Sequence, residues 1–143
     1  MKLQYWKYAL LWALLILFYS TDRFSSNNTD SIFATVVNFF YSGLNADQMY
    51  LFHIKFRKFM HFFNYAILSW LALFGFTLSL RPLKKWNFRV AMYAVVFCLF
   101  WAVLDETNQS FSLVRGGSLR DVGLDTVGAI FTQVVFFIRK KCV

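Results

Sequence analysis

The sequence predicts an all-α integral membrane protein with about four transmembrane helices and an interfacial amphipathic helix between the first two. Of its 143 residues, 59% are hydrophobic and only 15% are charged, and the mean hydropathy is +0.50. A soluble domain carries about 25% charged residues, because it needs a hydrated surface. The apolar residues also gather in four runs that are bordered by basic clusters. A chain of this length has no room for a second domain of ordinary size, so a single domain over residues 1–143 is expected.

The four apolar runs account for the predicted spans in order. The first covers residues 8–21 and lacks a small-residue cleavage site after it, which favours an uncleaved helix over a signal peptide. The second, residues 59–80, is about long enough to cross a bilayer at about 1.5 Å per residue, and Pro82 follows its end. The third and fourth, residues 90–104 and 122–138, are short. The polar residues at their outer ends are therefore expected within the membrane surface or just at it.

A long connector separates the first two runs. Residues 22–30 are rich in Ser, Asn and Asp and predict a loop. Residues 31–44 space their apolar side chains with a helical period, which predicts a short amphipathic helix in the membrane interface. Residues 51–57 partly alternate like a strand, but an isolated strand would leave its backbone unpaired at the membrane. A helix that continues into the second span is expected there, with His53 as a surface residue.

The distribution of charge predicts the orientation. If the N-terminus is cytoplasmic, the inner segments hold nine basic residues and no acidic one, whereas the outer segments hold six basic residues and all seven acidic ones. Lysine and arginine bias sets the orientation of membrane proteins, so both termini are expected in the cytoplasm. The net charge of +8 does not indicate nucleic-acid binding, because its residues flank apolar runs and form no soluble basic face.

Polar residues from three predicted helices meet at one depth on the outer side. Ionisable groups at the centre of a span cost roughly 2.5–3.5 kcal/mol each, so they persist when they face one another. Side chains three or four positions apart share a helix face. Helix caps and salt bridges between helices would explain any single residue, but several acids converging with a histidine exceed that need. The set comprises Lys58, His61, Asn64 and Tyr65, then Asp105, Glu106 and Gln109, then Arg115, Arg120, Asp121, Asp125, Gly128 and Thr132.

Three motifs in this set resemble those of the VanZ-like family. They are Lys58-x-x-His61-x-x-x-Tyr65-x-x-Leu68, Asp105-Glu106-x-x-Gln109 and Arg115-x-Gly117-Ser118-x-x-Asp121-Val122, with Gly128-Ala129 after the last and Phe18-Tyr19-Ser20-Thr21 at the end of the first helix. The resemblance covers essentially the whole chain. Two positions depart from the family pattern: Asn64 stands where an acid is common, and Asp125 where asparagine is usual. The resemblance implies a bacterial cytoplasmic-membrane protein of the cell envelope, in a family named for a member that raises teicoplanin resistance. It implies no particular reaction.

Two hypotheses of function follow. In the first, the outer polar site binds a lipid-linked cell-wall component or a lipoglycopeptide and affects glycopeptide resistance, with Lys58 and Arg115 suited to a phosphate or carboxylate. In the second, the protein is an intramembrane enzyme in which His61 or Glu106 acts as general base, Asp105 orients it and Arg115 stabilises an anion.

Residue roles follow from these hypotheses. No cofactor or metal is assigned, although Mg²⁺ or Ca²⁺ held by Asp105, Glu106, Asp121 and Asp125 is a variant of the second hypothesis. The catalytic candidates are His61, Asp105, Glu106, Gln109 and Asp121, and the substrate-binding candidates are Lys58, Tyr65, Arg115 and Asp125.

Overall fold

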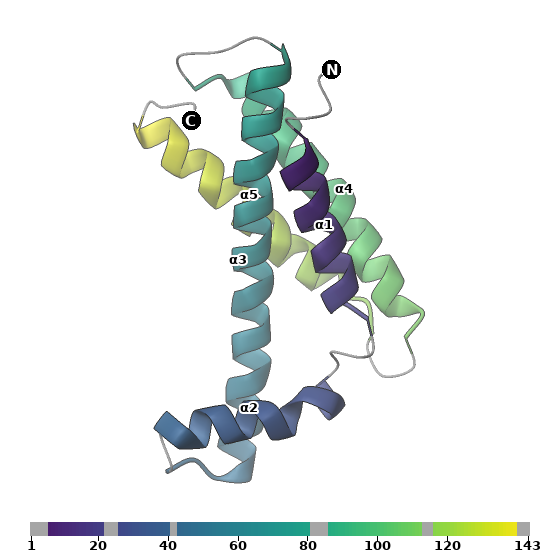
Figure 1. The fold of residues 1–143 in the computed structure, drawn as a ribbon, viewed down its shortest axis with the longest axis vertical. Helices are drawn as coiled ribbons and strands as arrows, with labels where there is room; N and C mark the ends of the chain where they lie inside the picture. Colours follow the sequence, from purple (N-terminus) through teal and green to yellow (C-terminus); the bar gives the residue numbers. More distant parts are fainter. Residues whose placement is uncertain (1–5, 22–25, 41–42, 81–85, 113–115, 140–143) are drawn as a thin grey trace.

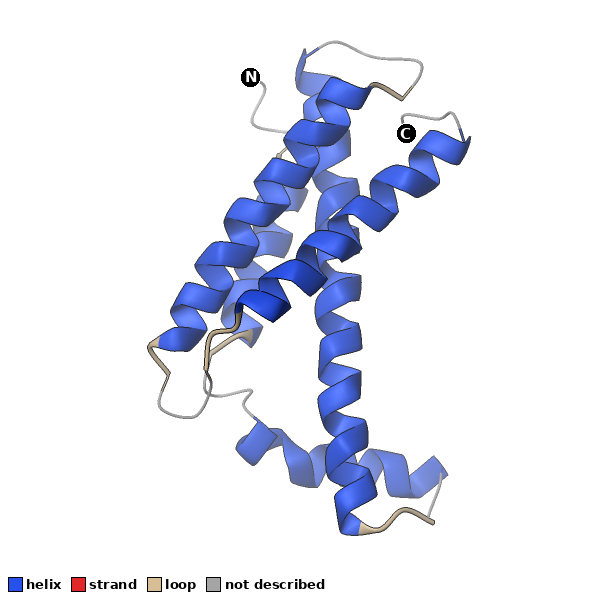
Figure 2. Cartoon of the chain, turned by 180° about the vertical axis from the view of Figure 1, so that it is seen from behind, coloured by secondary structure: helices blue, strands red, loops and turns tan. Residues whose placement is uncertain are grey.

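A computed structural model of the chain describes residues 6–21, 26–40, 43–80, 86–112 and 116–139. In these residues the structure contains helices and turns and no strand (Figure 2). The helices are α1 (Lys7–Tyr19), α2 (Ser26–Phe40), α3 (Ala46–Leu80), α4 (Phe88–Ser110) and α5 (Leu119–Arg139).

The all-helical fold class is confirmed, and three of the described helices are long and apolar enough to cross a membrane. These are α3, α4 and α5. α4 has 23 residues, which gives a length of about 34 Å at 1.5 Å per residue. It and α5 extend beyond their apolar runs, because the polar residues next to those runs continue the helix. α1 has only 13 residues, so the fourth span stays a prediction.

Local signals explain two of the helix starts. The Asn87 side chain accepts hydrogen bonds from the backbone N–H groups of Arg89 and Val90 and caps α4. At the start of α3, Asn45 Oδ1 accepts from the Gln48 backbone N–H at 2.8 Å, and Gln48 Oε1 accepts from the Asn45 backbone N–H at 3.1 Å. This reciprocal pair is a capping box, which satisfies amide groups that the first turn leaves without partners.

The connector differs from the prediction in two respects. Ser26–Asp30 belong to α2, so the loop predicted over 22–30 is wrong there, whereas residues 22–25 lie outside the described part. Ser, Asn and Asp are also the residues favoured where helices begin, so their composition does not separate a loop from a helix start. His53 is 6% exposed and stacks on Phe33 of α2 with ring centroids 4.2 Å apart, so the surface position predicted for it is wrong. The helix predicted over 51–57 is confirmed as part of α3.

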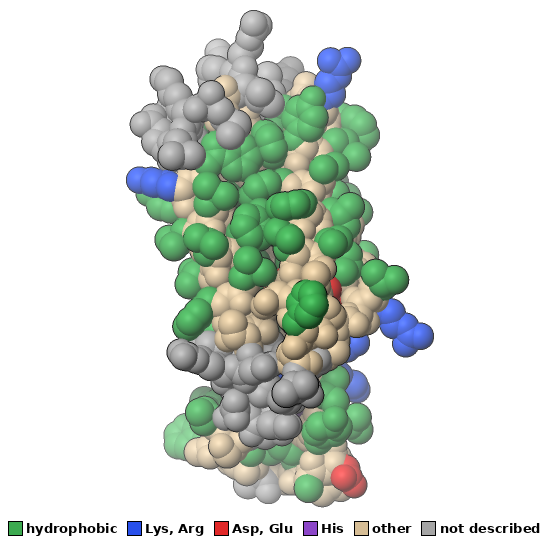
Figure 3. Space-filling model, turned by 90° about the vertical axis from the view of Figure 1, so that its right-hand side faces the viewer, with side chains coloured by type: hydrophobic (Ala, Val, Ile, Leu, Met, Phe, Trp, Pro, Cys, Tyr) green, Lys and Arg blue, Asp and Glu red, His purple; other side chains and the backbone are tan. Residues whose placement is uncertain are grey.

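α3 is the central element of the arrangement. α1, α4 and α5 pack along its C-terminal part, and α2 lies across it near its start (Figure 1). α1 and α4 run opposite to α3 and α5, so Lys7, Arg89 and Arg139 lie at the same end of the bundle. Hydrophobic side chains cover much of the face shown in Figure 3, and Lys and Arg side chains lie at its margins. An exposed apolar belt of this kind suits contact with lipid.

Small and weakly polar residues join α3 to α5. The Ser69 hydroxyl donates to the Ala129 carbonyl at 2.9 Å, and the Thr132 hydroxyl donates to the Ala66 carbonyl at 2.8 Å. A Cβ added at Gly128 would overlap the Phe62 carbonyl group. Membrane helices associate through such close backbone approach and interhelical hydrogen bonds. This contact holds the middle of α5 against the middle of α3, next to the candidate site.

Candidate functional site

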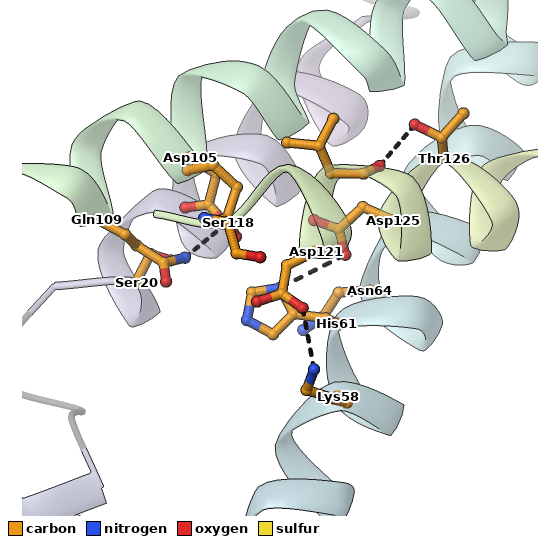
Figure 4. A network of polar contacts seen from close by, with 12 residues as sticks. Ser20, Lys58, His61, Asn64, Asp105, Gln109, Ser118, Asp121, Asp125 and Thr126 are labelled. Carbon is orange, nitrogen blue, oxygen red and sulfur yellow. Dashed lines mark hydrogen bonds and ion pairs between the residues drawn. The ribbon is translucent and has the colours of Figure 1, made fainter. Parts of the chain in front are cut away.

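The polar residues converge where α1 and α4 end and α5 begins, against the middle of α3. Figure 4 shows side chains from all four helices pointing toward one another at this level. His61, Asp105, Glu106 and Asp125 each offer one potential ligand atom, and these four atoms lie within 4.8 Å of one another. The structure therefore brings His61 of α3 to the acidic pair of α4, as the shared depth and helix faces predict.

His61 and Asp125 form the link between α3 and α5 within the cluster. His61 Nδ1 lies 3.5 Å from Asp125 Oδ1. The Asp125 side chain is fully buried, whereas that of His61 is 24% exposed. The sequence hypothesis gave the task of orienting His61 to Asp105, but the residue in contact with its Nδ1 is Asp125. The choice was open in the sequence because both acids lie at the right depth.

Asp105 is held by a polar chain that reaches α1. Gln109 Nε2 donates to Asp105 Oδ2 at 3.3 Å and to Ser20 Oγ at 2.7 Å. The Ser20 hydroxyl also interacts with Asp105. All three side chains are buried, with exposures of 0% for Asp105, 6% for Gln109 and 5% for Ser20. Gln109 thus orients one oxygen of Asp105 and ties the end of α1 to the cluster.

Glu106 is fixed by the segment that precedes α5. Its Oε2 accepts a hydrogen bond from the Ser118 backbone N–H at 2.7 Å. Gly117 lies so close to the Glu106 carbonyl oxygen that an added Cβ would overlap it, which explains a residue without a side chain there. A groove of about 210 Å³ runs alongside and is lined by Val103, Glu106, Thr107, Ser110, Gly117, Ser118, Leu119 and Val122. Glu106 is therefore the acid of the cluster that borders a groove on the outer surface of the helices.

Lys58 and Asp121 lie beside the cluster and form their own ion pair. Lys58 Nζ is 3.4 Å from Asp121 Oδ1, and their side chains are 55% and 30% exposed. Asp121 interacts electrostatically with Glu106 and Asp125, but it is not one of the four residues whose ligand atoms converge. The metal variant predicted from the sequence used Asp121 as the fourth ligand. In the structure, the fourth converging residue is His61.

The remaining predicted residues fall into three cases. Tyr65 is fully buried on α3 and interacts electrostatically with Asp105 and Asp125. Asn64 lies next to His61 (Figure 4) and is half-buried. Arg115 lies outside the described residues. The functional roles of all these residues stay predictions.

Two contributors were present in the sequence motifs without being assigned a task. Ser20 ends the first apolar run, and Ser118 stands in the motif before α5. Ser20 bonds Gln109 through its side chain, and Ser118 bonds Glu106 through its backbone. A serine at the end of a helix and a backbone amide carry no sequence signal of their own, so only their place in the family motifs hinted at these contacts.

These features define a helical membrane protein with a buried histidine–carboxylate cluster at one end of its bundle. The chain belongs to the VanZ/LLP1 family, whose model matches residues 5–140. This match confirms the family resemblance that the motifs indicated. No curated protein and no solved structure matches the chain.

Proposed function

We propose that this VanZ-family protein crosses the bacterial cytoplasmic membrane four times and binds a lipid-linked cell-wall component or a lipoglycopeptide at an outward-facing site, thereby affecting glycopeptide resistance. In this proposal α1 is the fourth span, α2 lies in the outer interface, and both termini are cytoplasmic. The antiparallel order of α1, α3, α4 and α5 supports it, because it puts Lys7, Arg89 and Arg139 at one end and the acids at the other.

The groove beside Glu106 is the observation that carries the binding proposal. Its walls combine apolar Val103, Leu119 and Val122 with the polar groups of Glu106, Thr107 and Ser110. Leu119 is 90% exposed, and Val103 is 47% exposed. An amphipathic groove at the membrane surface suits a ligand whose apolar chain stays in lipid while its head group reaches the acids. Carboxylates accept hydrogen bonds from hydroxyl and amino groups, which are abundant in sugars and glycopeptides.

Glu106→Gln tests this proposal, because it removes the charge and retains an oxygen that can accept from the Ser118 amide. Purified protein in detergent would be mixed with a lipid-linked cell-wall precursor or with teicoplanin, and bound ligand would be measured by native mass spectrometry. We expect at least tenfold weaker binding by Glu106→Gln at an unchanged melting temperature. Teicoplanin susceptibility of a host carrying this variant should then match that of a host without the protein.

Asp47→Asn is the matched control. Asp47 lies exposed in the first turn of α3, so this substitution removes one negative charge away from the site. This variant should bind like the wild type. Absence of binding by the wild type, or equal binding by Glu106→Gln, would contradict the proposal. Loss of phenotype that simply follows the melting temperature would show that Glu106 is part of the scaffold.

The second candidate function is catalysis on the same class of ligand, and the His61–Asp125 contact favours it. A histidine whose Nδ1 faces a buried carboxylate has its orientation set, and its Nε2 can then act as a general base. Incubation of a labelled lipid-linked precursor with purified protein separates the two functions. A binding protein leaves the label intact, whereas an enzyme converts it and loses that conversion in His61→Gln.

A further inference from the structure

One histidine and three carboxylates from three helices converge in a combination that is found in metal-binding sites. We propose that His61, Asp105, Glu106 and Asp125 form a binding site for a divalent transition-metal cation, with Mn²⁺ or Zn²⁺ as the preferred ions. The four potential ligand atoms lie within 4.8 Å of one another. This site goes beyond the proposed function, because it concerns an inorganic ligand and can be tested without any lipid.

The three acids of the cluster are almost completely buried, and a bound cation would compensate their charge. Asp105 and Asp125 are 0% exposed, and Glu106 is 6% exposed. Within the described part of the chain, Asp105 Oδ1, Glu106 Oε1 and both oxygens of Asp125 have no hydrogen-bond partner. The nearby lysine, Lys58, is already paired with Asp121. A buried carboxylate is costly unless it is paired or coordinates a metal, so a single imidazole does not balance three of them.

The way in which two of the acids are held is typical of metal ligands. Asp105 has Oδ2 bonded to Gln109 and Oδ1 unpaired, and Glu106 has Oε2 bonded to the Ser118 amide and Oε1 unpaired. In each case one oxygen is fixed by the protein, and the other has no hydrogen-bond partner among the described residues. Outer hydrogen bonds of this kind orient the ligands of metal sites, where the second oxygen binds the ion.

Tyr65 supplies an observation outside the acidic group. Its side chain is 0% exposed, and its hydroxyl has no hydrogen-bond partner among the described residues. It lies near Asp105 and Asp125. A buried tyrosine hydroxyl usually finds a partner. Beside an occupied metal site, it could donate to a ligand carboxylate or to a water molecule on the ion.

The spacing and the ligand types select the class of cation. Opposite ligands stand about 4.0–4.2 Å apart around Mg²⁺ and about 4.6–5.2 Å apart around Ca²⁺, so a group no wider than 4.8 Å can close on an ion with small side-chain movements. Imidazole nitrogen suits Zn²⁺ and other transition ions, whereas carboxylate oxygens suit Mn²⁺, Mg²⁺ and Ca²⁺. A mixed set of one nitrogen and three oxygens therefore favours Mn²⁺ or Zn²⁺ over an ion that prefers oxygen alone.

Metal binding by the full-length protein tests the site directly. Purified protein in detergent would be stripped with a chelator and titrated with MnCl₂, with unbound Mn²⁺ counted by electron paramagnetic resonance. Zn²⁺ would be measured by competition with a chromogenic indicator. We expect one ion per chain for the wild type and at least tenfold weaker binding for Asp105→Asn and for Asp125→Asn. Asp47→Asn, exposed at the start of α3, should bind like the wild type.

Thermal stability gives a second readout. The melting temperature of the wild type should rise with added metal and fall with chelator, because an ion that binds only the folded state stabilises it. Asp125→Asn should lose this response, because it removes one of the ligands of the ion.

Three outcomes would overturn the proposal. They are a wild type that binds no divalent ion, asparagine variants that bind it as the wild type does, and a site that takes Mg²⁺ or Ca²⁺ in preference to Mn²⁺ and Zn²⁺. If Asp125→Asn fails to fold, the wild-type stoichiometry and Glu106→Gln still decide the question. None of these measurements contains a lipid, so the cation site and the proposed ligand-binding function can fail separately.

Discussion

At the scale of single residues, glycine decides how closely α5 approaches α3. A Cβ at Gly128 would overlap the Phe62 backbone, whereas a Cβ at Gly123 of the same helix would meet nothing within 4 Å. The approach at Gly128 matters for the site, because Asp125 lies one helical turn before it and reaches His61 across the same contact. The close approach at Gly128 thus helps to set the distance between Asp125 and His61.

Gly128→Ala should therefore destabilise the fold by about 1–3 kcal/mol, because the added methyl group meets backbone that cannot move aside easily. Gly123→Ala is the matched control and should be stabilising by about 0.5–1 kcal/mol, since alanine is the better helix former. Unfolding of both variants in detergent by a denaturant titration would measure the difference. Equal stabilities would mean that α3 and α5 do not approach as described.

At the scale of elements, hydrogen bonds between α3 and α5 supplement this close packing. Gln133 Nε2 donates to Ser69 Oγ at 2.7 Å, and the Ser69 hydroxyl donates to the Ala129 carbonyl. Ser69 is 0% exposed, so neither bond competes with bulk water. Such bonds between membrane helices contribute about 0.6 kcal/mol on average and at most about 1.7 kcal/mol.

Ser69→Ala should accordingly cost about 0.6–1.7 kcal/mol, and less than Gly128→Ala, because it removes hydrogen bonds without separating the helices. Thr107→Val serves as the control: the Thr107 hydroxyl is exposed and bonds only the Val103 carbonyl of its own helix. Its stability should stay within about 0.5 kcal/mol of the wild type. The same denaturant titration applies, and a larger loss in Thr107→Val than in Ser69→Ala would contradict this account of the helix contact.

At the scale of the whole molecule, the helix order separates most of the helix-end basic residues from the buried acids. Lys7, Arg89 and Arg139, which stand at helix ends, lie at the end of the bundle opposite to the buried acids, whereas Arg120, at the start of α5, lies at the end of the acids. α2 lies on the side of the acids (Figure 1). This arrangement corresponds to the lysine and arginine rule when the termini are cytoplasmic.

Single cysteines in a cysteine-free background should report this orientation in intact cells. A cysteine at position 47, at the start of α3, should react with a membrane-impermeant thiol reagent, whereas a cysteine at position 84 should react only after the membrane is permeabilised. Replacement of Cys98 and Cys142 by serine supplies the background. Reaction at position 84 in intact cells, with none at position 47, would reverse the proposed topology.

Part of this molecule follows from the sequence alone. The helical fold class, the approximate positions of α3, α4 and α5 and the family were all predictable, because the apolar runs and the Asp105-Glu106-x-x-Gln109 motif are local features. The depth shared by His61 and the acids was also predictable, since these residues lie at or near the ends of the apolar runs. The polar connector was misread over residues 26–30, because helix starts and loops favour the same residues.

Only the tertiary structure decided which of the polar residues meet. Sequence periodicity assigns a residue to a helix face, but the rotation and crossing of each helix decide which face points inward. This is why Asp125 rather than Asp105 contacts His61 Nδ1, and why Asp121 pairs with Lys58 beside the cluster instead of completing it. The inward positions of the cluster residues depend on contacts such as the one at Gly128, which bring together atoms from separate helices.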